Sequence, residues 1–321
     1  MGSTDSAVKP PPTGWKAWST KKKALLIGSL LFLIALAVGL GVGLGLGLNN
    51  DDDDDNDNDN GGDNNGDNGG GDNNTTTWQP ALGASWQIVL RYPLNDTTPD
   101  VDIYDIDLFD NPKSTISSLQ SRGRRVICYF SAGTYEDWRS DADSFPAADI
   151  GDNLDDWPGE SWVNISSSTI RDIMTTRLDL AQEKGCDGVD PDNVDGYDNP
   201  NGLRLTEDDS ADYMRFLAEE ARKRGLSIGL KNAGAIIPRV IGAMQWSVNE
   251  QCAQYDECDV YAAFTRADKP VFHIEYPKGD ETNNEVEVQG RRRTEACDFE
   301  DSGDFSTVMK NMNLDNWFQD C

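Results

Sequence analysis

The 321-residue chain is short of histidine, and this shortage limits its chemistry. Its one histidine, His273, lies within an apolar strand pattern and fits a core or rim residue better than a catalytic base. A Ser-His-Asp nucleophile is therefore excluded. The six cysteines include no C-x-x-C spacing, so we expect no zinc site, no other metal and no cofactor. The chemistry that remains for this chain is that of carboxylates.

Positive charge is also scarce, with 28 Lys and Arg against 57 Asp and Glu and a net charge of −29. Residues 1–48 hold five Lys and one Asp, and residues 49–77 hold ten Asp and no base, which leaves −23 for residues 78–321. This acidity argues against a nucleic acid partner, because phosphates would be repelled. It suits a cationic substrate, although solubility in an extracellular space would explain the charge equally well.

Residues 1–77 predict an anchor and a stalk. Residues 24–48 carry no charge and are long enough to span a bilayer, whereas a cleaved signal peptide would have a shorter apolar region. Five lysines precede this segment, so we expect residues 1–23 in the cytoplasm and the rest outside, as in a single-pass type II protein of the plasma membrane. Residues 49–77 are nearly all Asp, Asn and Gly and predict a disordered linker, where proteolysis would release the remainder.

All six cysteines lie in residues 78–321, and an even number in an oxidising compartment suggests disulfides. Cys252–Cys258 would close a small loop, and Cys297–Cys321 would fasten the C-terminus. N-glycosylation sequences at Asn73, Asn74, Asn95 and Asn164 fit the secretory route. We expect a monomeric ectodomain.

Residues 78–321 predict a (β/α)8 barrel of the TIM type. Their length, about 244 residues, is close to the roughly 250 residues of such barrels. Short strand patterns alternate with helical ones, which predicts a mainly parallel sheet of seven or eight strands. Strands are expected at 86–91, 101–108, 125–130, 188–190, 227–230, 244–248, 261–264 and 271–274, helices at 113–122, 169–184 and 208–224, and a long loop at 131–164.

The chain is organised around residues 185–197, G-C-D-G-V-D-P-D-N-V-D-G-Y. A short strand pattern between two helices ends here in carboxylates, as strands do at the catalytic end of a barrel. An acidic turn is the alternative, since Asp, Asn and Gly all favour turns. A calcium loop is rejected, because the fifth, sixth and twelfth positions counted from Asp190 are Val194, Asp195 and Asn201.

Polar residues follow the other strands as well, and in a barrel all would meet on one face. Several acidic strand ends on one face are costly unless a site uses them. Two carboxylates beside aromatic rings are the equipment of glycoside hydrolysis. Aromatic rings from 131–164 would stack on sugar faces; the alternative is that Trp157 and Trp162 only pack the loop. The candidate site residues are Asp105, Asp107, Tyr129, Tyr135, Trp138, Trp157, Asp190, Asp192, Asn193, Asp195, Lys231, Asn232, Glu250, Glu275 and Tyr276.

Five segments together resemble glycoside hydrolase family 114, the endo-α-1,4-polygalactosaminidases. They are C-Y-F-S-A-G-T-Y-E-D-W-R at 128–139, W-P-G-E-S-W at 157–162, the stretch at 185–197, G-L-K-N at 229–232 and V-N-E-Q-C at 248–252. The resemblance implies a (β/α)8 barrel that cuts α-1,4-linked galactosamine in galactosaminogalactan of fungal cell walls and biofilms. It places the catalytic pair on Asp192 and Glu250. Asp190 departs from the Glu that the resemblance leads us to expect.

Within this resemblance, our hypothesis makes Asp192 the nucleophile and Glu250 the general acid/base of a retaining reaction. The remaining candidates would bind substrate, with Asp105, Asp107, Asp190, Asp195 and Glu275 facing its amino groups; Asp195 would alternatively cap a turn. Two rival functions stay open. One is an α-galactosidase or α-N-acetylgalactosaminidase, which would gain nothing from the acidity. The other is a wall-binding protein that keeps the barrel without catalysis.

Overall fold

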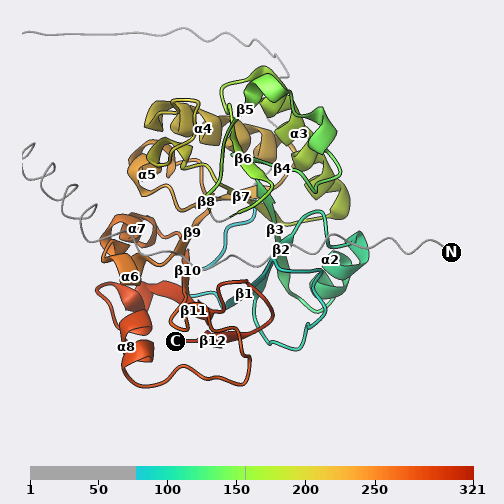
Figure 1. Cartoon of the computed structure of the whole chain (residues 1–321). Coiled ribbons are helices and arrows are strands. Elements are labelled where there is room, and N and C mark those ends of the chain that lie inside the picture. The colour runs from blue at the N-terminus through green and yellow to red at the C-terminus, as the bar shows by residue number, and fades with distance from the viewer. Residues whose placement is uncertain (1–76, 156) are drawn as a thin grey trace, which may run out of the picture. The chain divides into compact units, whose positions relative to one another are not determined.

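We describe the protein from a computed structural model, which covers residues 77–155 and 157–321 (Figure 1). The predicted cytoplasmic tail, membrane anchor and acidic linker lie outside the described residues. In the part of the chain that is described, no helix is long and apolar enough to cross a membrane.

One sheet forms the centre of the fold, and its strands run parallel in chain order, apart from the antiparallel last strand. This nearly closed sheet confirms the predicted TIM-type barrel. Helices lie around it, with α3 and α4 near the top of Figure 1 and α6, α7 and α8 at its lower left. The strands are β1 (Trp86–Val89), β2 (Ile103–Asp107), β3 (Arg125–Ser131), β7 (Gly188–Asp192), β8 (Ser227–Lys231), β9 (Trp246–Glu250), β10 (Val271–Glu275), β11 (Phe305–Lys310) and β12 (Phe318–Asp320).

Side chains complete the barrel between β1 and β11, which share no strand ladder. The indole Nε1 of Trp86 donates to Ser306 O at 2.8 Å, and Lys310 Nζ donates to Gln87 Oε1 at 2.8 Å. Lys310 is fully buried, and burial lowers its pKa to about 7. These contacts bring the first and last parallel strands together, as closure of a barrel requires.

The long helices begin and end at recognisable signals. Thr206 and Asp209 form a reciprocal capping box at the start of α4. Gly185 ends α3 with a left-handed conformation, φ 83°, which turns the chain into β7. The helices are α2 (Lys113–Gln120), α3 (Ser168–Lys184), α4 (Glu207–Lys223), α5 (Ile237–Val240), α6 (Cys252–Tyr255), α7 (Cys258–Thr265) and α8 (Arg291–Cys297), with short 3-10 turns at Ala142–Ser144, Ala147–Asp149, Gly196–Asp198, Gly234–Ile236 and Ser302–Asp304.

Aromatic rings fill the barrel interior at the N-terminal ends of the strands, which we call the lower end. Trp86 and Phe272 have ring centroids 5.1 Å apart, and Trp246 lies 6.3 Å from Phe272. Two glycines make room for the Trp246 indole, because a Cβ at Gly229 would lie 2.0 Å from its Nε1 and one at Gly188 would lie 2.6 Å from its ring. We name Trp86, Gly188, Gly229, Trp246 and Phe272 the aromatic layer.

Two expectations about secondary structure are wrong. Residues 261–264 belong to helix α7, because a short buried apolar run does not by its pattern distinguish a strand from a buried helix. The expected loop at 131–164 contains a small antiparallel sheet of β4 (Thr134–Glu136), β6 (Glu160–Val163) and β5 (Ile150–Asn153), in that order. The expected list also lacks β11.

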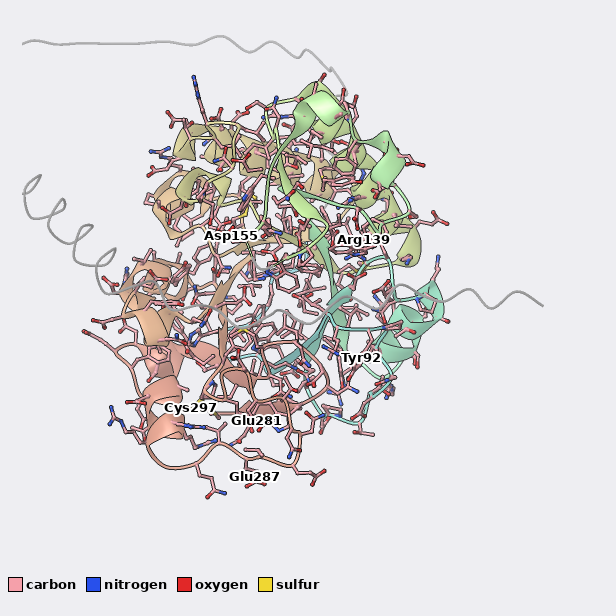
Figure 2. The ribbon with its side chains drawn as sticks, in the orientation of Figure 1. Tyr92, Arg139, Asp155, Glu281, Glu287 and Cys297 are labelled. Carbon is pink, nitrogen blue, oxygen red and sulfur yellow. A yellow bond between two sulfur atoms is a disulfide. The ribbon has the colours of Figure 1, made fainter. Side chains whose placement is uncertain are left out.

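Both guessed disulfides are confirmed, Cys252–Cys258 and Cys297–Cys321, and Cys128 pairs with Cys186. Cys297, labelled in Figure 2, ties the end of α8 to the C-terminal residue. Cys128 lies in β3 and Cys186 just before β7, so the third bridge joins two neighbouring strands near the central stretch.

Candidate active site

Strand alternation decides which side chains enter the barrel. Val248 belongs to the interior cluster with the aromatic layer, so Glu250, two residues on, also faces inward. Val189 belongs instead to the outer cluster that packs under the helices, so Asp190 and Asp192, one and three residues further along β7, both point the other way, into the barrel. Asp192 is also the last residue of β7, and barrel enzymes carry their active sites at this C-terminal end of the strands.

Lys231 joins the two carboxylates of the predicted catalytic pair. Its Nζ lies 3.3 Å from Asp192 Oδ2 and 3.1 Å from Glu250 Oε2. The Lys231 side chain is 2% exposed, whereas those of Asp192 and Glu250 are 17% and 23% exposed. The cation therefore lies below, and the two carboxylates remain open to a ligand from above. Although burial opposes it, Asp192 and Glu250 raise the pKa of Lys231 well above its usual value.

Two tyrosines also donate hydrogen bonds to this pair. Tyr129 donates its hydroxyl to Asp192 Oδ2 at 3.0 Å, and Tyr276 donates a short hydrogen bond to Glu250 Oε1. Asn232 Nδ2 donates to Glu250 Oε2 at 3.2 Å. Burial alone would raise the pKa of Glu250, but Lys231, Tyr276 and Asn232 together hold it below the ordinary value. The site thus favours an ionised Glu250 before substrate arrives.

Three residues that directly follow β7, β8 and β9 have a backbone conformation that is unusual outside glycine. Asn193 and Gln251, each directly after a catalytic candidate, have φ of 60° and 65°, and Asn232 has φ of 49°. Such left-handed turns are costly outside glycine and concentrate at functional sites. The turn at Asn232 lets its Oδ1 accept from Glu250 N at 3.0 Å while its Nδ2 reaches the carboxylate. Asn232 therefore holds both the backbone and the carboxylate of Glu250.

Asn193 anchors the end of β7 to the small sheet. Its Nδ2 donates to Ser131 Oγ at 3.0 Å and to Glu160 Oε1 at 3.0 Å, and its own N–H donates to Asp192 Oδ1 at 2.8 Å. Gly133 permits this approach, since a Cβ there would lie 1.6 Å from Asn193 O. Glu160 was absent from the sequence-based candidates, although the W-P-G-E-S-W segment contains it.

Asp195 lies three residues after Asp192, directly before the 3-10 turn at Gly196–Asp198. Burial and the Asp192 charge raise the pKa of Asp195 to about 7. Burial and the Asp195 charge raise the pKa of Tyr197, and the same charge contributes to the raised pKa of Tyr261. Tyr261 comes from α7, so no strand-end pattern in the sequence pointed to it.

Asp107, a predicted substrate-binding residue, already has a protein partner. Its carboxylate makes two hydrogen bonds to Arg139, at 3.0 and 2.7 Å, and Arg139 also donates to both oxygens of Glu136. All three side chains are at most 4% exposed. Figure 2 labels Arg139 on the side of the barrel that carries the small sheet. The structure thus places Asp107 in a buried ion-pair network rather than against a ligand.

Glu275 points away from the barrel interior, because Ile274 and Tyr276 on either side of it face inward. It accepts from Ala253 N at 2.9 Å and lies 2.9 Å from His273 Nε2. His273 is fully buried, as expected of a core residue. Among residues 77–155 and 157–321, the one group with metal-ligand spacing is Cys252, Cys258 and His273, and its two sulfurs form a disulfide.

The predicted sugar-stacking rings lie on the small sheet and its loops. Tyr135 packs edge-on against Phe145, with ring centroids 5.5 Å apart. Trp138 and Trp157 are half-buried, and Trp162 is buried at 4% exposure. The packing alternative therefore describes Trp162, while Trp138 and Trp157 keep exposed surface.

Parallel strands that end in a lysine-bridged carboxylate pair define a barrel hydrolase of the two-carboxylate class. The family model of glycoside hydrolase family GH114 matches residues 70–321. The chain belongs to this family and is a glycoside hydrolase. No curated protein matches it in sequence.

Solved structures give the same assignment. The chain is similar to Ega3 of Aspergillus fumigatus, whose crystal structure is a complex with galactosamine, with 65% identity, a TM-score of 0.76, and coverage of 78% of this chain and 100% of that one. The glycoside hydrolase domain of PelA from Pseudomonas aeruginosa matches at 16% identity and a TM-score of 0.54, covering 73% of this chain and 98% of that one. The second likeness shows the fold alone.

Proposed function

We propose that the protein is an endo-acting hydrolase of α-1,4-linked galactosamine in galactosaminogalactan-type polysaccharide, and that Asp192 and Glu250 carry the reaction. The observation that carries this proposal is Lys231, which holds both carboxylates at the open end of the barrel. Family membership and the galactosamine bound to Ega3 support the substrate.

The spacing of the pair supports a retaining reaction. Asp192 Oδ2 and Glu250 Oε2 both contact Lys231 Nζ, so these oxygens are at most about 6.4 Å apart, the sum of the two contacts. Inverting enzymes separate their carboxyl groups by roughly 6.5–9.5 Å to admit a water, and retaining enzymes by roughly 5–5.5 Å. For these two oxygens the bound falls just below the inverting range and above the retaining spacing, so it favours retention without reaching that spacing.

Assignment of the two roles is a separate question. A nucleophile must be ionised, and a general acid must hold a proton. The lowered pKa of Glu250 in the free enzyme favours the ionised form. For Glu250 to act as the acid, as we hypothesise, a bound substrate must raise this pKa, for example by displacing the Tyr276 or Asn232 hydrogen bond. Azide rescue distinguishes the roles, because a variant of the nucleophile and a variant of the acid/base give glycosyl azides of opposite anomeric configuration.

The charge of the site supports a cationic substrate. Galactosamine without its acetyl group is cationic near neutral pH, and Asp192 and Glu250 pair with one lysine while Asp195 lies close to Asp192. An ammonium group on the sugar would offset part of this negative charge. Neutral galactosides would not, so we expect α-galactosidase activity to be weak.

The test incubates the protein with deacetylated galactosaminogalactan, its N-acetylated form and a neutral α-galactan, and follows products by mass spectrometry. Asp192→Asn and Glu250→Gln run alongside. We expect short galactosamine oligomers from the wild type alone and only with the deacetylated polymer. Binding without cleavage by the wild type would replace this proposal with the wall-binding function, and cleavage of the neutral polymer would favour the α-galactosidase function.

We further propose that the enzyme acts at the surface of its own cell, as a plasma-membrane type II glycoprotein with an extracellular barrel. The support is the sequence of residues 1–77 and the three disulfides, which suit an oxidising compartment. Protease protection of membrane vesicles tests the orientation, because an external barrel is digested only from outside.

A further inference from the structure

Two aspartates below the catalytic pair have no explained role. Asp105 in β2 and Asp190 in β7 are both fully buried at 0% exposure. Their strands flank β3, where Ile127 is in register with Asp105 and Tyr129 with Asp190. Neither carboxyl group can touch a substrate at the mouth of the barrel without rearrangement, so we do not expect them to bind its amino groups directly.

The surroundings of these oxygens are unusual. Within the described residues, no N–H or O–H donor reaches any of the four oxygens, which would be costly for two buried carboxylates. The two carboxyl groups are instead each other's close neighbours, because each shifts the pKa of the other. A carboxylate only accepts hydrogen bonds, so the two can bond to each other only when one of them holds a proton.

The surrounding charges decide where the proton lies. Asp190 lies nearer to Lys231, whose charge is the strongest influence on it after burial, and Lys231 in turn feels Asp190 after Asp192 and Glu250. For Asp105, the charge of Asp190 outweighs that of Lys231. Burial raises the pKa of Asp190 to about 7 and that of Asp105 well above its usual range. Asp105 is therefore the acid, and Asp190 becomes the carboxylate.

We propose that Asp105 and Asp190 form a buried acid–carboxylate pair that positions Lys231, with Asp105 donating its proton to Asp190 and Asp190 facing the lysine from below. The Lys231 ammonium group then lies between Asp190 on one side and the catalytic Asp192 and Glu250 on the other. These three carboxylates together fix its position along the barrel axis. The pair is a positioning element and does not touch the substrate. This inference rests on the proposed function, because the lysine matters through Asp192 and Glu250.

The titratable groups that face the pair are Tyr129 on β3, Asp192 on β7, Lys231 on β8 and Glu250 on β9. Since Asp190 and Glu250 repel each other, the charge of Asp190 keeps the pKa of Glu250 higher than it would otherwise be. Loss of that charge therefore lowers the pKa of Glu250. A protonated Asp105 contributes no such charge, so the two aspartates should differ in their effect on the pH profile.

Infrared difference spectroscopy of the whole protein tests the proton without substrate. Subtracting the spectrum of Asp105→Asn from that of the wild type at pH 8 should leave the carbonyl band of a protonated carboxyl group. Asp315→Asn is the matched control, because the buried Asp315 accepts from Asn311 and Trp317 and its loss removes a carboxylate and no acid. Absence of the protonated band in the Asp105 difference would overturn the proposal, whether or not the enzyme cleaves galactosamine.

Kinetics test the positioning role. Asp105→Asn keeps an N–H donor for Asp190, so we expect kcat within about threefold of the wild type, whereas Asp105→Leu leaves Asp190 without a donor and should lower kcat by roughly 10–100-fold. KM should change little in either. With Glu250 as the general acid, its pKa sets the basic limb of kcat/KM, so Asp190→Asn should move this limb to lower pH, and Asp105→Asn should leave it in place. Equal loss of kcat in Asp105→Asn and Asp105→Leu, with no change in either profile, would show that the pair has only a structural role.

Discussion

The lower and upper halves of the barrel interior are built from opposite kinds of residue. The aromatic layer below is apolar and close-packed, and Gly188 and Gly229 leave the space that the Trp246 indole occupies. The layer above it, which we name the carboxylate layer, holds Asp105, Asp190, Asp192, Lys231 and Glu250. Packing explains the first layer, and compensation of charge explains the second. The difference indicates that stability resides mainly below and chemistry above.

Loss of a large ring from the aromatic layer should have the largest effect on stability. Trp246→Ala would open a cavity between β7, β8 and β9, and we expect a loss of roughly 3–5 kcal/mol in the free energy of unfolding. Urea denaturation measures this value. Turnover per folded molecule should stay near that of the wild type, and a large loss of turnover at unchanged stability would reverse the roles of the two layers.

Removal of the cation should act on chemistry instead. Lys231→Met leaves Asp192 and Glu250 without their shared partner, and we expect kcat to fall by roughly 10²–10³-fold. The pKa of Glu250 should rise because Lys231 now lowers it, and with Glu250 as the general acid the basic limb of the pH profile should move to higher pH. Arg224→Met is a matched control, since it removes a cation that pairs with Asp179 and Glu220 at the C-terminal end of α4, before β8 begins, whereas Lys231 is the last residue of β8. A wild-type profile in Lys231→Met would contradict this view.

Asp107 tests whether every carboxylate in the upper barrel serves the substrate. Asp107→Asn weakens two hydrogen bonds from Arg139, and we expect it to cost about 1.5–3 kcal/mol of stability. Thermal unfolding measures the loss, and KM should not change. A raised KM at unchanged stability would return Asp107 to the substrate-binding set.

The smallest expected effect is on the pH dependence of stability. Asp190 and Asp195 have pKa values of about 7 in the folded protein against 3.8 when unperturbed, so the folded state binds more protons. Their contribution to stability is therefore present below pH 3.8 and is lost as pH rises toward 7. We expect Asp195→Asn to make the fall in melting temperature between these two pH values shallower. An identical slope in the variant would show that Asp195 ionises freely in the folded state.

Much of the barrel could be predicted because it depends on local patterns. Short strands alternate with helices, and carboxylates at parallel strand ends must converge, which brought Asp192, Lys231 and Glu250 together in advance. The alternation of side chains along β10 also indicates the direction of Glu275, which our prediction did not use. Phe272, Ile274 and Tyr276 share one phase along β10, so the opposite phase of Glu275 was readable from the sequence.

Other features depend on contacts between distant segments, which no local pattern reveals. Arg139 comes from the segment after β3 and neutralises Asp107 at the end of β2. Tyr261 reaches the site from α7, whose apolar run resembles a strand. The acid–carboxylate pair requires β2 and β7 to lie one strand apart, which only the sheet order establishes.

The most direct test of this division between stability and chemistry is one preparation of Glu250→Gln, assayed at pH 7 for both melting temperature and turnover of deacetylated galactosaminogalactan. We predict a melting temperature close to that of the wild type, because the aromatic layer is unchanged, and a fall in turnover of roughly 10²–10⁴-fold. A folded variant that still cleaves at the wild-type rate would contradict it. So would a variant that loses its fold together with its activity.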